Sequence, residues 1–172
     1  MSATNSLHYQ LCCEGAKYII QPRAKERLQG PFLWSSVELV CSGCELTDVW
    51  ATNRDVSCVI EVKTSHTDFL NDKKKYSRSE QAKNVGHQMG NYRYYLCPEG
   101  IIKEDELPDG WGLLYWNGKK ITRVKISDYF ETTRRFDFLA LCSIFERENG
   151  RHKIYNYREK NKTEENGETI GI

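Results

Sequence analysis

The chain has 172 residues and a formal net charge of +1, with 39% hydrophobic and 28% charged residues. This composition is ordinary for a globular protein and excludes disordered and collagen-like chains. The near-neutral charge excludes a uniformly basic surface, so any contact with nucleic acid needs a local basic patch. No apolar run approaches the roughly 18 to 20 residues that cross a bilayer, so we expect no membrane partner.

The N-terminal residues lack the basic start and apolar run of a secretory signal, and the cysteine count of seven is odd. We therefore expect a reducing, cytoplasmic environment. We also expect one domain over residues 1–157, followed by a polar and flexible tail over 158–172.

The first half of the chain predicts a helix and three strands. Apolar residues near helical spacing indicate a helix over 5–21, with Asn5 or Ser6 as N-cap and Pro22 at its end. Runs rich in aromatic and branched residues then predict strands at 32–40, 45–52 and 56–64. Residues that favour tight turns separate these strands, which indicates an antiparallel meander.

The second half predicts a helix that begins at His66 and continues as a solvated stretch to about Lys83. Further strands are expected at 91–97, 111–116 and 121–126, with a short turn or helix at 104–108 and a closing helix at 135–147. Asn117-Gly118 is a strong hairpin signal between the last two strands. Together these elements predict an α/β fold, a mixed sheet with a helix on each face.

Acidic side chains gather on one face of the predicted meander. Glu61 and Lys63 share a face because side chains alternate along a strand. A hairpin that turns at Arg54-Asp55 places Asp48 opposite Glu61, and a loop centred on Gly43 places Glu38 opposite Asp48. Opposed like charges are destabilising, so we expect Lys63 and a divalent metal to compensate them. A one-residue slip in either turn would separate the acids.

Carboxylate oxygens together with water suit Mg²⁺ or Mn²⁺. Such an ion lowers the pKa of a bound water and stabilises charge on a phosphorane-like transition state, while an adjacent ammonium orients the nucleophile. The pattern therefore indicates chemistry on a phosphodiester.

Asp48, a hairpin and then Glu61-Val62-Lys63 resemble the D-(x)n-E-x-K signature of the PD-(D/E)XK superfamily, the restriction-endonuclease-like nucleases. The run E-V-K-T-S-H-T-D-F-L and the later stretches from Met89 and Glu106 are similar to small stand-alone members from bacteria and phages, some linked to DNA repair. The resemblance covers roughly residues 7 to 126, and Thr47 stands where many members have proline.

The resemblance implies a restriction-endonuclease-like core in which Asp48, Glu61 and the backbone carbonyl of Val62 bind Mg²⁺ or Mn²⁺. Lys63 would assist the attacking water. Glu38 and Glu14 occupy places where relatives supply an extra acid. Phosphate contacts are expected where the crossing helix begins, and two further candidates precede the next strand. The expected nucleic-acid-binding residues are Ser65, Lys73, Lys74, Lys75, His87 and Gln88.

Cys41-Ser-Gly-Cys44 is interpreted either as half of a zinc knuckle or as a turn flanked by small buried thiols. The function that we predict is a Mg²⁺-dependent deoxyribonuclease in DNA repair, recombination or phage DNA processing. Its specificity would come from DNA shape, strand ends or a protein partner. The alternatives are an inactive nuclease-like scaffold that binds nucleic acid or a protein, and an RNA-cleaving defence effector.

Overall fold

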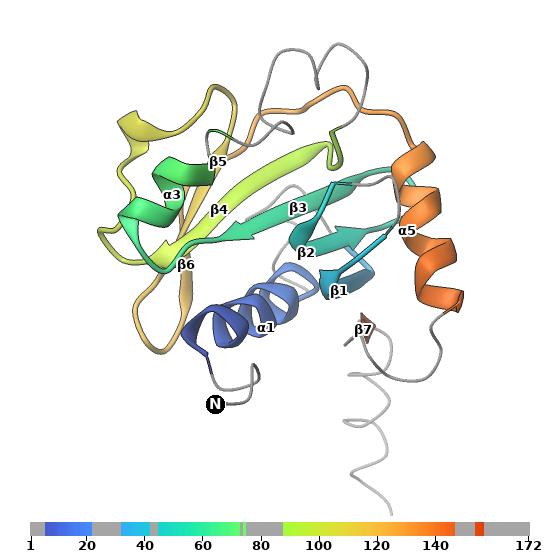
Figure 1. Ribbon diagram of the computed structural model, residues 1–172, viewed down its shortest axis with the longest axis horizontal. Helices are drawn as coiled ribbons and strands as arrows, with labels where there is room; N and C mark the ends of the chain where they lie inside the picture. The colour runs from blue at the N-terminus through green and yellow to red at the C-terminus, as the bar shows by residue number, and fades with distance from the viewer. Residues whose placement is uncertain are drawn as a thin grey trace, which may run out of the picture.

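A computed structural model describes residues 6–21, 32–41, 45–72, 74, 88–146 and 154–156. Within these residues a mixed sheet of seven strands runs in the order β6-β5-β4-β3-β2-β1-β7, with helices packed against it (Figure 1). The predicted α/β class with a mixed sheet is confirmed. Across the same residues, no helix is both long and apolar enough to cross a membrane.

Helix α1 (Leu7–Ile19) begins at Ser6, whose Oγ accepts a hydrogen bond of 3.1 Å from the N–H of Tyr9. Ser6 is therefore the N-cap, one of the two residues that the sequence offered. The helix buries the apolar stripe that its spacing predicts, including Leu11, Ala16 and Ile19. The expected end at Pro22 lies outside the described residues.

Strands β1 (Trp34–Leu39), β2 (Thr47–Thr52) and β3 (Ser57–Val62) form the predicted antiparallel meander. Val49 faces Val37 on one side and Ile60 on the other. Both predicted registers are thereby confirmed. The turn between β2 and β3 is held by the Asn53 side chain, whose Oδ1 accepts hydrogen bonds of 2.8 Å from the N–H groups of Asp55 and Val56.

The remaining strands extend the sheet on the other side of β3. Strand β4 (Tyr92–Pro98) is parallel to β3, β5 (Gly112–Trp116) is parallel to β4, and β6 (Ile121–Lys125) returns antiparallel to β5. A further strand that the sequence did not predict, β7 (Ile154–Asn156), pairs antiparallel with β1. The expected tail over 158–172 lies outside the described residues.

Helix α3 (His66–Asp72), the 3₁₀ helix η3 (Glu104–Glu106) and helix α5 (Arg135–Glu146) complete the fold. Beyond Asp72, the described part of the chain contains only Lys74 of the stretch expected to continue to about Lys83.

Separate apolar clusters lie on the two faces of the sheet. Helix α1 packs on one face through Leu11 and Ala16, which share a cluster with Val49 and Ile60. Phe69 of α3 joins a cluster on Tyr95, and Phe136 of α5 joins another with Trp50 and Val59. Each large side chain buried in this way contributes roughly 1.5 to 3 kcal/mol. Because β3 is buried on both faces, its polar residues lie in a low-dielectric environment.

Helix α5 is also held by a polar contact beneath it. The Asp137 carboxylate accepts hydrogen bonds of 3.0 Å from the Trp50 indole N–H and from the Ser57 hydroxyl. These bonds satisfy a buried acid and fix the helix over β2 and β3.

Candidate metal centre

The candidate site lies where β2 and β3 separate. The last paired residues of this ladder are Val49 and Ile60, and beyond them the Val62 N–H donates to Asp48 Oδ2 at 2.7 Å instead of to the β2 backbone. The N–H and C=O of one strand residue point to the same side of the strand, so the Val62 carbonyl also points to this opening. The Asp48 carboxylate therefore lies beside the Glu61-Val62-Lys63 run.

Lys63 forms buried ion pairs with Glu61 and with Asp72 of α3. Glu61 is 1% exposed and Lys63 is 3% exposed. The Lys63 ammonium Nζ lies 3.3 Å from Glu61 Oε2 and 3.1 Å from Asp72 Oδ1. Burial on its own would lower the pKa of Lys63, but the charges of Glu61 and Asp72 outweigh it and raise that pKa above its ordinary value. Lys63 is therefore protonated at neutral pH.

Asp72 is a site residue that sequence reasoning missed. Its second oxygen, Oδ2, accepts a hydrogen bond of 2.8 Å from the Tyr95 hydroxyl on β4. Phe69 and Asp72 are the two buried residues of α3 and lie three positions apart, so they share the face that packs on the sheet. That spacing was a usable signal, but it was obscured by the polar composition of the surrounding run.

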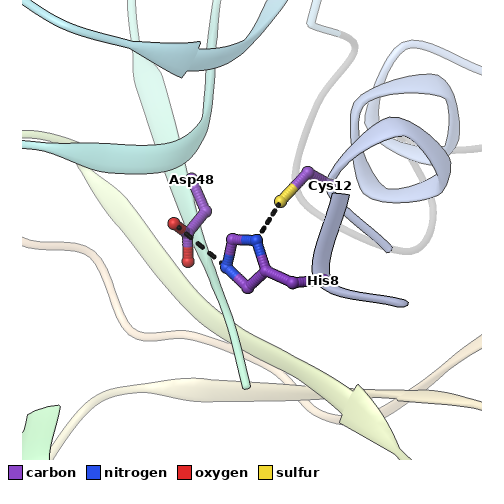
Figure 2. A group of neighbouring side chains, drawn as sticks. All are labelled: His8, Cys12 and Asp48. Carbon is purple, nitrogen blue, oxygen red and sulfur yellow. Dashed lines mark hydrogen bonds and ion pairs between the residues drawn. The ribbon is translucent and has the colours of Figure 1, made fainter. Parts of the chain in front are cut away.

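His8 of α1 contacts the other oxygen of the Asp48 carboxylate. Its Nε2 lies 3.4 Å from Asp48 Oδ1, and its Nδ1 lies 3.6 Å from Cys12 Sγ (Figure 2). The hydrogen bond with Asp48 raises the pKa of His8. Burial would raise the pKa of Asp48, but the hydrogen bond from His8 and the charge of Lys63 outweigh it and lower that pKa. Asp48 is therefore ionised at neutral pH.

Glu38 reaches the site through an unusual backbone conformation. Its φ is 49°, in the left-handed region that residues other than glycine seldom adopt. Its neighbours Val37 and Leu39 pack into clusters on opposite faces of the sheet, although residues two apart on a regular strand share a face. This local break accompanies an approach of Glu38 Oε1 to within 3.6 Å of His8 Nδ1.

The resulting cluster has the donors and the charge of a cation site. Ligand atoms of His8, Cys12 and Asp48 all lie within 4.8 Å of one another. Among the described residues, four carboxylates surround Lys63 and His8, so negative charge is in excess and a cation would be stabilised there. These carboxylates are Glu38, Asp48, Glu61 and Asp72. His8 and Cys12 were not predicted at this site because their position beside Asp48 depends on how α1 packs on the sheet.

The other predicted site residues lie apart from this cluster or outside the described residues. Glu14 pairs with Lys17 at 3.0 Å along α1, and Ser65 Oγ accepts a 3.2 Å hydrogen bond from the Asp68 N–H at the start of α3. Lys74 is exposed and Gln88 is buried. The residues outside the described ranges are Lys73, Lys75 and His87.

Cys41 is disulfide-bonded. The expectation of free thiols around this turn is therefore wrong for Cys41. A disulfide sulfur is also not a thiolate ligand, so Cys41 in this form does not supply half of a zinc knuckle. Cys44 lies outside the described residues.

Comparison with known proteins bears on the fold. No family model matches the chain, and no curated protein matches it. The chain is similar to the solved structure of a protein of unknown function from Silicibacter pomeroyi, with a TM-score of 0.56 and 17% sequence identity. The match covers 94% of this chain and 93% of the other. At this identity the likeness shows a shared fold, and fold alone does not carry function.

Proposed function

We propose that this protein is a metal-dependent nuclease of the PD-(D/E)XK type, which hydrolyses DNA phosphodiester bonds with Mg²⁺ or Mn²⁺. The observation that supports this proposal most strongly is the opening between β2 and β3. There the Asp48 carboxylate lies against the Val62 N–H, beside the buried Glu61–Lys63 pair. Asp48 on β2 and the Glu61-Val62-Lys63 run at the end of β3, which the sequence pattern groups together, are thus also close in space.

In this proposal Asp48, Glu61 and the Val62 carbonyl would hold the ion. When bound, the ion would act as a Lewis acid on the phosphate and lower the pKa of a water molecule. Lys63 lies between two carboxylates and is protonated at neutral pH. Its role is therefore to orient the attacking water and stabilise negative charge, and it does not serve as a general base.

The exposed side of the site is the side that a phosphate would approach. The side chains of Glu38, His8 and Asp48 are 48%, 33% and 22% exposed, while those of Lys63 and Glu61 are 4% and 1% exposed. Roles in DNA repair, recombination or phage DNA processing, in the cytoplasm and with a protein partner that supplies specificity, belong to the same proposal.

The burial of Glu61 and Lys63 also favours a second candidate, a nuclease-like scaffold that binds nucleic acid or a protein without cleaving it. A lysine enclosed by two carboxylates is stable without substrate, and an active enzyme would need it to reach the reacting water. Metal binding and cleavage separate the two candidates, because only the enzyme needs both.

The test incubates purified protein with single-stranded, duplex and branched DNA and with matched RNA, in Mg²⁺, Mn²⁺ or a chelator. We expect metal-dependent cleavage of DNA that falls at least about 10²-fold in Asp48→Asn and in Lys63→Ala. Glu99→Gln, an exposed acid in the turn after β4, is the matched control and should keep full activity.

Equal activity in Lys63→Ala and wild type would contradict the mechanism. Preferred cleavage of RNA would point to the defence-effector alternative. Mn²⁺ binding that is lost in Asp48→Asn, without cleavage of any substrate, would support the scaffold.

A further inference from the structure

We infer that helix α1 supplies two ligands to this centre, a nitrogen of the His8 imidazole and the sulfur of the Cys12 thiolate. With these ligands the centre holds a divalent transition-metal ion in preference to Mg²⁺. The inference deepens the proposed function and rests on it for the position of the centre, since both concern the ion beside Asp48. Ions with a preference for nitrogen and sulfur ligands include Fe²⁺, Co²⁺ and Zn²⁺.

The positions of the donor atoms support this ligand set. His8 and Cys12 lie four residues apart on α1 and therefore face the same way. Cys12 Sγ is 3.6 Å from His8 Nδ1, Asp48 Oδ1 is 3.4 Å from His8 Nε2, and one donor atom from each residue lies within 4.8 Å of the others. A tetrahedral ion with bonds of about 2.0 to 2.3 Å separates its ligand atoms by roughly 3.3 to 3.8 Å. A histidine binds one ion through one ring nitrogen. With His8 Nε2 as the ligand atom, Asp48 Oδ1 already lies at such a separation, and Cys12 Sγ, which lies beside Nδ1, would rotate toward the ion to complete the set.

The chemistry of the donors selects the ion. Mg²⁺ prefers oxygen ligands and retains several of its waters, whereas imidazole and thiolate favour transition metals. Ion binding replaces the proton of the Cys12 thiol, and that proton leaves to solvent. Since Cys12 is completely buried, the ion would enter past the part-exposed His8 and Asp48 side chains.

Glu38 lies where a carboxylate would orient a metal-bound His8 ring. Its left-handed backbone is unfavourable for a glutamate, and such strain gathers at functional sites. It places a carboxylate 3.6 Å from His8 Nδ1, while Asp48 lies at the other ring nitrogen. A carboxylate at the ring nitrogen that does not bind the ion is the usual partner of a metal-bound histidine, because it fixes the ring orientation.

Co²⁺ added to the chelator-treated full chain is the direct probe. A thiolate ligand gives Co²⁺ a near-ultraviolet charge-transfer band, which oxygen and nitrogen ligands do not give. We expect this band in wild type and in Cys13→Ser, which removes the neighbouring thiol on α1, and its loss in Cys12→Ser. We also expect His8→Gln to weaken Co²⁺ binding at least about tenfold. In wild type, Mg²⁺ in large excess should not displace Co²⁺.

Co²⁺ bound at an Asp48-dependent site without the band, or with the band unchanged in Cys12→Ser, would overturn the inference. So would unchanged affinity in His8→Gln, a part-exposed position that tests the centre even if Cys12→Ser fails to fold. Mg²⁺-dependent cleavage would then leave the proposed function intact. The band together with no cleavage of any nucleic acid would instead support the inference and contradict the nuclease.

Discussion

At the scale of single residues, His8 links the two halves of the centre. It contacts Asp48 through one ring nitrogen and both Cys12 and Glu38 through the other. Sequence reasoning found Asp48, Glu61 and Lys63 because neighbouring strands and a tight turn fix their relative positions. It missed His8 and Cys12 because their place depends on how α1 docks on the sheet, which no local pattern specifies.

The raised pKa of His8 gives a pH dependence with a definite sign. The contact of protonated His8 with Asp48 stabilises the folded state fully below about pH 6.5, the ordinary histidine pKa. This stabilisation is lost as pH rises through the folded-state pKa of His8. The lowered pKa of Asp48 means that its own stabilising effect is lost only as pH falls through that lower value. The pair is thus strongest between about pH 4 and 6.5.

We therefore expect His8→Gln to reduce the free energy of unfolding most at pH 5 to 6, and much less at pH 8 to 9. Urea unfolding of both proteins across this range, in the presence of a chelator, measures the difference. A difference that stays constant or grows as pH rises would contradict the assigned His8–Asp48 contact.

At the scale of elements, the meander was predicted in register and β7 was not. Asn53 fixes the turn between β2 and β3 through its own side chain, so local chemistry determines which residues face each other. β7 spans only Ile154–Asn156, too short for an alternating pattern, and pairs with β1 from far along the chain. The sequence therefore predicted the register of strands joined by short turns. It did not predict the pairing of strands that lie far apart in the chain.

Helix α3 is held to the sheet by polar contacts of Asp72 and by an apolar contact of Phe69. A substitution at Asp72 removes the polar contacts and leaves the apolar contact in place. Asp72 accepts from Tyr95 and pairs with Lys63, while Phe69 packs edge-on against the Tyr95 ring. Removing one partner of a buried ion pair leaves the other charge poorly compensated.

Asp72→Asn should lower the free energy of unfolding by about 2 to 4 kcal/mol at pH 7, since Lys63 then keeps only Glu61 of its two carboxylate contacts within the described ranges. Chemical denaturation measures this loss. Asp109→Asn, an exposed acid before β5, is the control and should change stability by less than about 0.5 kcal/mol. Equal effects of the two substitutions would show that the Asp72–Lys63 pair does not stabilise the fold.

At the scale of the whole molecule, charge is distributed unevenly although the total is close to zero. The chain carries a net charge of +1, yet four carboxylates meet at one end of β2 and β3 around Lys63 and His8. Glu61, Lys63 and Asp72 are buried from solvent, which strengthens every charge interaction at this point. The fold therefore concentrates negative potential where a cation would be held.

A crystal structure of the protein grown with Mn²⁺, with the ion located by its anomalous scattering, measures this directly. We predict one Mn²⁺ with oxygens of both Asp48 and Glu61 at about 2.0 to 2.3 Å. An ion bound elsewhere, or Asp48 and Glu61 carboxylates too far apart to share it, would contradict the metal centre and the nuclease with it.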